Sequence, residues 1–323
     1  MREFLLAGSK KECHSHLEFQ GQRLDGRKPS EYRNVDISLG SDATCVVSLG
    51  STKVMAHASC ELVQPKAFRP NEGILTISVH LDNQLPDDSE NISTVDIVCL
   101  NRTLEKLLKD SKSVDLESLC LMADEKVWNL RVEVYILNSE GSILDCASIA
   151  ALCALKQVKI PHNVSFGNDQ IDVGGTVEQF DVPVVMNHSP VLVSYALFKE
   201  TIISDPSRFE ESIADAVVTF GLNTSGELCL LNMEGNMLIT TNMLVHISKI
   251  AHRRAKAVLE TIEDTIAKAV ALEKENKINV GLSSLTLCPP TLEKKFNIHF
   301  RDFSYKVKTG ISQEDDNGVE AME

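Results

Sequence analysis

The segment from Asp145 to Lys156 constrains the fold more than any other part of the sequence. It reads Asp-Cys-Ala-Ser-Ile-Ala-Ala-Leu-Cys-Ala-Leu-Lys, with small or apolar residues at almost every position, and Pro161 follows it as a stop signal. This composition predicts a helix that is apolar on nearly every side. Such a helix needs cover on all of its faces, so we expect it to be buried between two layers of the fold.

Alternating apolar and polar residues before and after this helix predict β-strands. In the first strand, Val35, Ile37 and Leu39 would lie on one side. Short turns at Gly40-Ser41-Asp42 and Gly50-Ser51 lead into the next two strands, which is typical of an antiparallel meander. The strands expected in the first half are 34–39, 44–49, 53–58, 74–79, 119–122 and 127–137.

A further helix is predicted after the fourth strand, with Ser93 or Thr94 as its N-cap. Its apolar residues recur with a period of about 3.6 residues, namely Ile97, Leu100, Leu104, Leu107 and Leu108. In the second half, strands are expected at 171–173, 181–186, 190–198, 215–222 and 227–233, and a long helix from about 242 to 274. The order of elements predicts an α+β domain made of two sheet-and-helix halves.

Composition and charge narrow the classes of protein to consider. With 43% hydrophobic and 24% charged residues among 323, the chain can build a substantial core and is not disordered as a whole. A net charge of −14 argues against a surface that coats nucleic acid but leaves room for one local basic groove. The nine cysteines form no C-x-x-C pair, which is typical of reduced thiols in a cytosolic or nuclear protein. No apolar stretch has the length of a membrane span or the form of a signal peptide.

We expect one domain from residue 21 to 274, with halves at about 30–160 and 180–274. Residues 1–20 are predicted to form a polar leader, and 275–323 a tail that is disordered when free or binds a partner. Within this tail, residues 296–305 alternate aromatic and polar side chains, which would suit a strand that docks on a partner's surface or sheet edge. The Cys13-His14-Ser15-His16 segment lacks a second ligand pair at zinc spacing, so we expect no metal site there.

The segment Arg23-Leu24-Asp25-Gly26-Arg27 resembles the opening signature of RNase PH-family proteins. Further matching segments keep their order and spacing over roughly residues 21 to 260, at 32–35, 50–54, 59–63, 71–74, 115–120, 125–128 and 145–151. The resemblance implies the α+β fold of this family, which is like that of domain 2 of ribosomal protein S5. Taken alone, Asp-Gly is a turn signal and the flanking arginines could form a local salt bridge with Asp25. Contact with RNA is the alternative.

The resemblance also implies where phosphorolysis of RNA would take place. That reaction needs an anion site with a cationic side chain at a helix N-terminus. In the catalytic branch of the family, a Gly-Thr-Arg or Gly-Ser-Arg run leads into the central helix. Here Leu144 stands where the arginine is expected, and Asp145 adds a negative charge beside it. We interpret Asp145 as a helix N-cap or a first-turn acid.

Phosphorolysis also needs a pair of carboxylates that position a divalent metal or move a proton. In the catalytic branch, an Asp–Glu–Asp segment is followed six residues on by a second Asp. Here the segment from Asp205 to Glu211 matches the first element with Glu for Asp, and Val217 stands at the second acid. Asp215 lies two residues earlier and on the same face by strand parity, so a register slip could restore the pair. We predict a degraded site that holds no metal or cofactor.

Three cations on the predicted helix after residue 93 are spaced to lie on one face. They are Arg102, Lys106 and Lys109, at i, i+4 and i+7. Their spacing alone favours an ordinary solvated face, with Glu105 and Lys109 as an ion pair. In the family such positions typically carry arginines that face a ring channel and touch RNA phosphates, so the resemblance favours RNA binding. Arg69 is a second candidate of the same kind.

The sequence and the resemblance together predict a non-catalytic ring subunit of the eukaryotic RNA exosome. It would support 3'–5' RNA processing and degradation by assembling the ring and lining its RNA channel. Expected partners are other RNase PH-like ring subunits, one of them catalytic-branch-like and side by side with this chain, S1/KH cap proteins, a hydrolytic exosome nuclease and single-stranded RNA, with no membrane. The expected location is the nucleus, the nucleolus and the cytoplasm. The alternatives are a residual phosphate-dependent 3'–5' exoribonuclease built on Asp205, Glu211 and Asp215, or a scaffold that never touches RNA.

Overall fold

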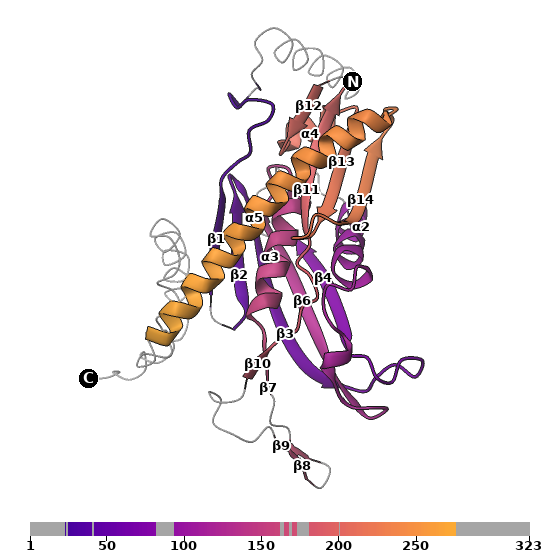
Figure 1. Ribbon diagram of the computed structural model, residues 1–323, viewed down its shortest axis with the longest axis vertical. Coiled ribbons are helices and arrows are strands. Elements are labelled where there is room, and N and C mark those ends of the chain that lie inside the picture. The colour runs from indigo at the N-terminus through magenta and orange to yellow at the C-terminus, as the bar shows by residue number, and fades with distance from the viewer. Residues whose placement is uncertain are drawn as a thin grey trace, which may run out of the picture.

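The computed structural model describes residues 23, 25–40, 42–81, 94–161, 165–167, 170–172, 181–199 and 201–275. The chain forms two main sheets with helix α3 (Ile143–Gln157) between them, and the long helix α5 (Thr241–Glu275) crosses the molecule diagonally (Figure 1). The expected leader, and the expected tail from residue 276 on, lie outside the described residues and stay predictions. Among the described helices, none is long and apolar enough to cross a membrane.

The first sheet has the strand order β1-β2-β3-β6-β4, with β5 beside β6. Its strands are β1 (Val35–Leu39), β2 (Thr44–Leu49), β3 (Thr52–Val63), β4 (Ile74–Leu81), β5 (Cys120–Met122) and β6 (Lys126–Asn138). The first three strands form the antiparallel meander that the alternating pattern predicts. β4 instead pairs with β6 in parallel. A parallel pair needs a long crossover, which here includes helix α2 (Thr94–Glu105) and the 3-10 turn η3 (Glu117–Leu119).

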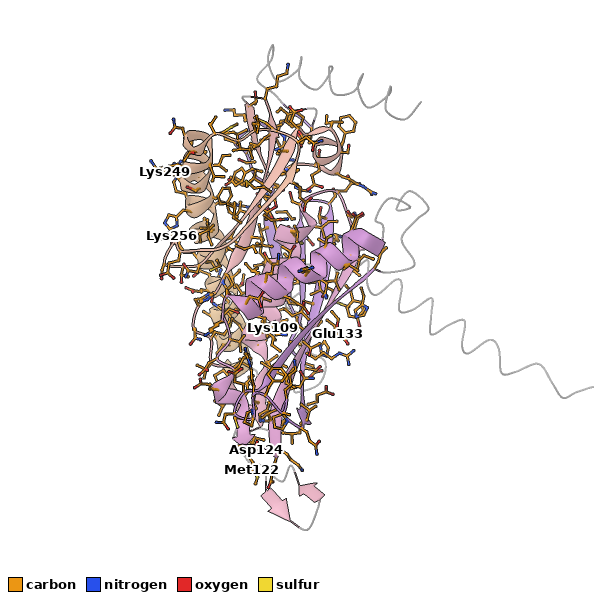
Figure 2. The ribbon with its side chains drawn as sticks, turned by 90° about the vertical axis from the view of Figure 1, so that its right-hand side faces the viewer. Lys109, Met122, Asp124, Glu133, Lys249 and Lys256 are labelled. Atoms are coloured by element: carbon orange, nitrogen blue, oxygen red, sulfur yellow. The ribbon has the colours of Figure 1, made fainter. Side chains whose placement is uncertain are left out.

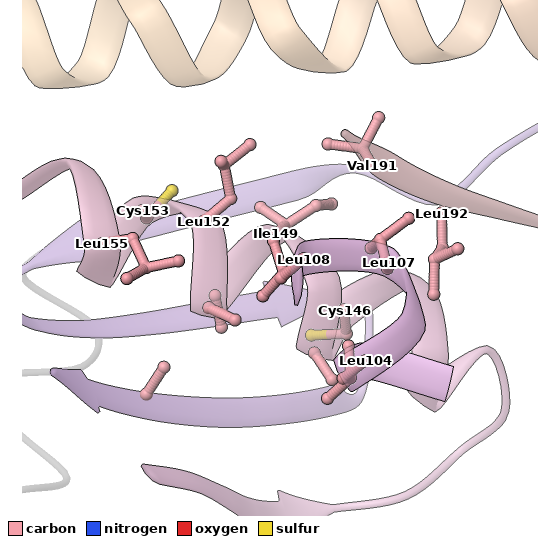
Figure 3. Packing of buried hydrophobic residues seen from close by; sticks show 14 of the residues in the cluster. Leu104, Leu107, Leu108, Cys146, Ile149, Leu152, Cys153, Leu155, Val191 and Leu192 are labelled. Atoms are coloured by element: carbon pink, nitrogen blue, oxygen red, sulfur yellow. The ribbon is translucent and has the colours of Figure 1, made fainter. Parts of the chain in front are cut away.

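Helix α3 is covered on all sides, as its composition requires. Every residue from Asp145 to Leu155 is buried. The helix packs on β2 and β3 of the first sheet and on β11 (Val191–Phe198) of the second. Figure 3 shows Ile149 and Leu152 of α3 close to buried leucines that follow α2 and to Val191. The predicted burial of this helix between two layers is confirmed.

The helix after β4 changes geometry along its length. α2 ends at Glu105 and continues as a π-helical turn, η2 (Lys106–Asp110). Successive side chains of a π turn are separated by a smaller angle than in an α-helix, and the adjacent Leu107 and Leu108 are both fully buried. The expectation of one continuous helix with a period of 3.6 residues is therefore wrong from Lys106 onward.

The second sheet has the order β12-β11-β13-β14, with antiparallel neighbours throughout. Its remaining strands are β12 (Thr201–Ser204), β13 (Ala216–Leu222) and β14 (Leu228–Gly235). Helix α4 (Arg208–Ile213) lies between β12 and β13 and begins with a capping box formed by Ser207 and Glu210. The sequence pattern did not predict β12 and α4, because elements this short show no clear hydrophobic period.

Four short strands connect the halves and pair as β7–β10 and β8–β9. They are β7 (Lys159–Pro161), β8 (Ser165–Gly167), β9 (Gln170–Asp172) and β10 (Asp181–Pro183). Buried residues of both halves belong to one continuous hydrophobic cluster. The two halves therefore share a core, and polar residues at their junction are enclosed by both.

Candidate functional site

Arg23, from the signature segment, is buried at the junction of the two halves. Its Nε donates to Glu210 Oε1 at 2.8 Å, and its guanidinium also forms an ion pair with the other oxygen of Glu210 in α4. It also donates to the backbone carbonyls of Ser204 and Asp205, at 2.9 and 3.0 Å. The expected local salt bridge is present between Arg27 and Asp25, at 2.6 Å. Arg23 itself has a longer-range role, because it fixes the start of the domain to the second half.

Asp205 is held by two arginines. Arg33 donates to it from its backbone N–H at 2.8 Å, its Nε at 2.9 Å and a terminal nitrogen at 2.6 Å. Arg27 also pairs with Asp205, with its Nη1 3.1 Å from Asp205 Oδ2. Burial alone would raise the pKa of Asp205, but the hydrogen bonds and charges of these arginines outweigh it and lower the pKa. Asp205 is therefore an ionised partner in a structural ion pair.

Glu211 faces the start of α3. Its Oε1 accepts a hydrogen bond of 2.7 Å from the backbone N–H of Ser142, the N-cap residue of that helix. The approach of the two segments is close, because a Cβ on Gly141 would lie 2.5 Å from the backbone of both Pro206 and Arg208. Burial raises the pKa of Glu211 to about 7, against the opposing effects of the Ser142 hydrogen bond and the Arg33 charge.

Asp145 lies in the first turn of α3, with its side chain directed to the second sheet. It accepts hydrogen bonds from the backbone N–H of Ser194 at 2.9 Å and from Ser194 Oγ at 2.6 Å. Burial raises its pKa to about 7, although these two hydrogen bonds act in the opposite direction. The first-turn position agrees with our interpretation, but the N-cap alternative is wrong, because Ser142 holds that place. Asp145 instead connects α3 to β11.

The other residues of the predicted former site lie on different elements. Leu144 is half-buried and packs against the main core. Val217 is paired with Ala196 and Glu234 inside the second sheet. Asp215 precedes that strand, and its carboxylate accepts a hydrogen bond of 3.0 Å from the backbone N–H of Lys199 in the β11–β12 turn. Its carboxylate is thus committed to the turn.

These contacts decide what the acids can do chemically. Asp205 is neutralised by arginines, while burial favours the protonated forms of Asp145 and Glu211. Among the described residues, no group of three or more His, Cys, Asp and Glu side chains is placed to hold a metal ion. The arrangement joins the two halves of the domain. Leu144 supplies no charge, and the cation beside the start of α3 is Arg33, which donates to the carbonyls of Glu140 and Gly141 at 3.2 Å.

The four predicted RNA-binding cations fall into two groups. Arg102 and Lys106 are exposed on α2 and η2. Lys109 lies in the π turn at the C-terminal end of the same helical segment (Figure 2), and it borders a hollow that Arg69 also lines. Neither Arg102 nor Lys106 lines this hollow. The structure therefore brings together Arg69 and Lys109, but not all four cations.

The hollow has a volume of about 840 Å³ and lies between the β3–β4 connection, η2 and the segment before η3. Phe68 also borders it and is 75% exposed. Its cations and acids are equal in number, namely Lys66, Arg69, Lys109 and Lys112 against Glu72, Asp110, Asp115 and Glu117. Phe68 and Lys66 were not among the residues predicted from the sequence. An aromatic residue between two cations in a proline-bounded loop was the signal that could have found them.

Comparison with known proteins supplies the family. Both domains of the 3' exoribonuclease (RNase PH) family match the chain, domain 1 over residues 31–161 and domain 2 over residues 188–254. Exosome complex component RRP45 of Danio rerio is 37% identical over 79% of this chain and 65% of that protein, and its Bos taurus counterpart 38% over 79% and 58%. The chain thus spans less than two thirds of the length of these two relatives. Exosome complex component rrp45 of Schizosaccharomyces pombe is 31% identical over 76% of this chain and 86% of that protein.

Solved structures agree on the fold. A chain of an archaeal exosome core superposes with a TM-score of 0.69 at 23% identity, covering 81% of this chain and 100% of that one. A chain of the Archaeoglobus fulgidus exosome with RNA bound to the active site gives 0.67 at 23% identity, covering 80% of this chain and 99% of that one. With its two matching domains, its relatives and its fold, this chain belongs to the RNase PH family of 3' exoribonuclease-type proteins.

Proposed function

We propose that this chain is a non-catalytic ring subunit of an RNA exosome, which supports 3'–5' RNA processing and degradation. Its relatives are named exosome complex components, and its fold matches chains of archaeal exosomes. One observation carries the non-catalytic part of the proposal. The three acids around the start of α3 are each committed to another part of the protein, Asp205 to Arg33, Asp145 to Ser194 and Glu211 to Ser142.

This arrangement disfavours a bound phosphate for an electrostatic reason. An anion at a helix N-terminus is held by free backbone N–H groups and a nearby cation. Here the N–H of Ser142 already donates to Glu211, and Leu144 supplies no charge. Phosphate would also have to approach the carboxyl groups of Asp145 and Glu211, whose raised pKa values indicate that a further negative charge is unfavourable there.

Phosphate-dependent degradation of RNA by the assembled ring tests the proposal. Glu211→Gln keeps an acceptor for Ser142, and Asp215→Asn keeps one for Lys199, so both changes remove charge with little disturbance of the fold. We expect neither variant to change the rate of RNA turnover. A tenfold drop with the ring intact, equivalent to about 1.4 kcal/mol in the barrier, would support the residual exoribonuclease instead.

The free edge of the second sheet supports the assembly part of the proposal. β14 ends the strand order among the described strands. It exposes Leu228, Leu231 and Met233 by 53%, 36% and 54%. An unpaired edge that carries exposed apolar side chains is a site for association with another chain. We propose that it contacts a neighbouring RNase PH-like subunit. S1/KH cap proteins and a hydrolytic nuclease are further proposed partners, by resemblance alone.

For the RNA part, we propose that Arg69, Arg102, Lys106 and Lys109 face the channel of the ring. The exposure of Arg102 and Lys106 supports this, as does the common hollow beside Arg69 and Lys109. Crosslinking of RNA inside the complete ring distinguishes this proposal from a scaffold that does not touch RNA. We also propose that the protein occurs in the nucleus, the nucleolus and the cytoplasm, which imaging of a tagged chain tests.

A further inference from the structure

Phe68 lies at the tip of a tight turn between β3 and β4. The turn is closed by a hydrogen bond of 2.9 Å from the backbone N–H of Arg69 to the carbonyl of Lys66, and these two residues form an isolated β-bridge. At 75% exposure, most of the Phe68 side chain is open to solvent. Aromatic side chains commonly supply a large part of the binding energy at a contact with a partner.

The base of this turn is fixed to the rest of the domain. Gly73 donates its backbone N–H to the carbonyl of Leu116 at 2.8 Å, and a Cβ at Gly73 would lie 2.4 Å from Leu119 Cβ. The carbonyl of Pro70 accepts a hydrogen bond of 3.3 Å from Asp124, and Arg69 pairs with Glu72 at 2.9 Å. The ring of Phe68 is therefore presented outward by an anchored turn, so little conformational freedom is lost when a ligand contacts it.

The surroundings of Phe68 match the way proteins hold single strands. Such sites combine an aromatic face, on which a base stacks, with cations that follow the phosphates. Lys66 and Arg69 flank Phe68 in the turn, and Lys109 and Lys112 line the hollow beside it. The acids of the hollow balance these charges, so the net attraction for phosphate is small. Stacking would then supply a large share of the affinity.

We propose that Phe68 is a stacking platform for one unpaired base of single-stranded RNA, with Lys66, Lys109 and Lys112 against the neighbouring phosphates. This inference rests on the proposed function, because RNA reaches the surface only if the ring threads it. It adds to that function an aromatic contact with RNA, at a place distinct from the cations Arg102 and Lys106, which do not line the hollow. Because every base has a π-face, the contact tolerates any sequence.

The test measures the affinity of the assembled ring for oligo(U) and oligo(A) from about 50 to about 200 mM salt. Phe68→Ala should weaken both by roughly 5- to 150-fold, equivalent to about 1–3 kcal/mol. The slope of log affinity against log salt should stay unchanged, because no phosphate contact is lost. Phe68→Tyr keeps the aromatic face and should retain the affinity. The matched control is Phe209→Ala, at a 43% exposed aromatic in α4 outside the hollow.

Each other result overturns the inference in a recognisable way. Unchanged affinity of the Phe68→Ala ring shows that no base stacks there. An equal loss with Phe209→Ala shows an unspecific effect of removing a surface aromatic. A Phe68→Ala chain that fails to enter the ring, while rings that do form bind RNA normally, shows that Phe68 contacts a protein partner. If the wild-type chain forms no ring at all, the proposed function fails first, and sedimentation of the unmodified complex reveals this separately.

Discussion

Glu211 accepts a hydrogen bond of 2.7 Å from the backbone N–H of Ser142, across 69 positions of the chain. The contact joins α4 to the start of α3, the place where the family resemblance puts a phosphate. Asp145, three residues after Ser142 on α3, is buried and its pKa is raised to about 7, as is that of the half-buried Glu211. At neutral pH, the junction of the two halves therefore holds two carboxyl groups that are only partly ionised. Its stability should depend on pH.

Replacing Asp145 with Asn should change the pH dependence of folding. The pKa of Asp145 is 3.8 in its ordinary state and about 7 in the fold, so the folded protein holds this proton longer than the unfolded one. The contribution of Asp145 to the free energy of unfolding is therefore fully present below about pH 4, where the side chain is protonated in both states. It is lost as pH rises toward 7. Since each pKa unit corresponds to about 1.4 kcal/mol, the total change is on the order of a few kcal/mol.

Asp145→Asn stays neutral at every pH and can still accept from Ser194. We therefore expect a higher urea midpoint than wild type at pH 8, a smaller difference at pH 5, and nearly the same midpoint below about pH 4. Asp36→Asn, at an exposed acid in β1, is the control and should shift neither midpoint. Lower stability of Asp145→Asn at pH 8 would show that the ionised carboxylate is needed there.

Asp205 should make the opposite contribution. Its pKa is lowered in the fold, so its stabilising effect is present above the ordinary carboxyl pKa and is lost as pH falls through the lowered value. Asp205→Asn leaves the largely buried charge of Arg33 without its carboxylate partner, while Arg27 keeps Asp25, and should cost about 3–5 kcal/mol of unfolding free energy near neutral pH. Asp25→Asn removes only the more exposed partner of Arg27 and should cost about 1 kcal/mol or less. Chemical denaturation of both variants measures the difference, and equal losses would contradict it.

Charge reversal tests whether the cations of α2 and η2 contact RNA. Replacing Arg102, Lys106 and Lys109 by Glu should lower RNA affinity and flatten its log–log salt dependence by roughly two units, because each single-strand phosphate contact contributes about 0.7. The loss should not depend on RNA sequence. The control reverses three exposed cations on α5, namely Arg253 together with Lys249 and Lys256, which are labelled in Figure 2. It changes the net charge equally, and an equal flattening there would mean that only the overall field matters.

Charged residues introduced on β14, at the edge of the second sheet, should block assembly of the ring. Leu231→Asp and Met233→Asp together place two charges on β14, where both side chains are exposed and contribute little to the core. We expect the free chain to unfold at nearly the same temperature as wild type but to be excluded from the ring in sedimentation experiments. Val98→Asp makes the same kind of change on α2, at a residue 65% exposed, and should leave assembly intact. Normal incorporation of the β14 variant would place the subunit contact elsewhere.

The sequence by itself determined those elements whose buried faces can be inferred from a single continuous stretch of residues. The apolar run from Asp145 to Lys156 required a buried helix, and α3 is that helix with two residues more at its start and one at its end. Alternation predicted the meander of β1 to β3, and the predicted helix at 242–274 agrees with α5 within one residue at each end. In each case the signal is local, since the side chains that face one layer recur at the period of the element.

Only the tertiary structure decided what the polar residues do. Arg23 meets Glu210 across 187 positions, and Arg33 meets Asp205 across 172. No spacing in the sequence encodes such a pair, because the meeting depends on where the chain returns after two sheets have formed. The hollow beside Phe68 likewise depends on packing between distant segments, since residues 66–75, 109–117 and 187 line it together. Local periodicity reports which face of an element is buried, whereas ion pairs and binding surfaces depend on what the completed fold places against that face.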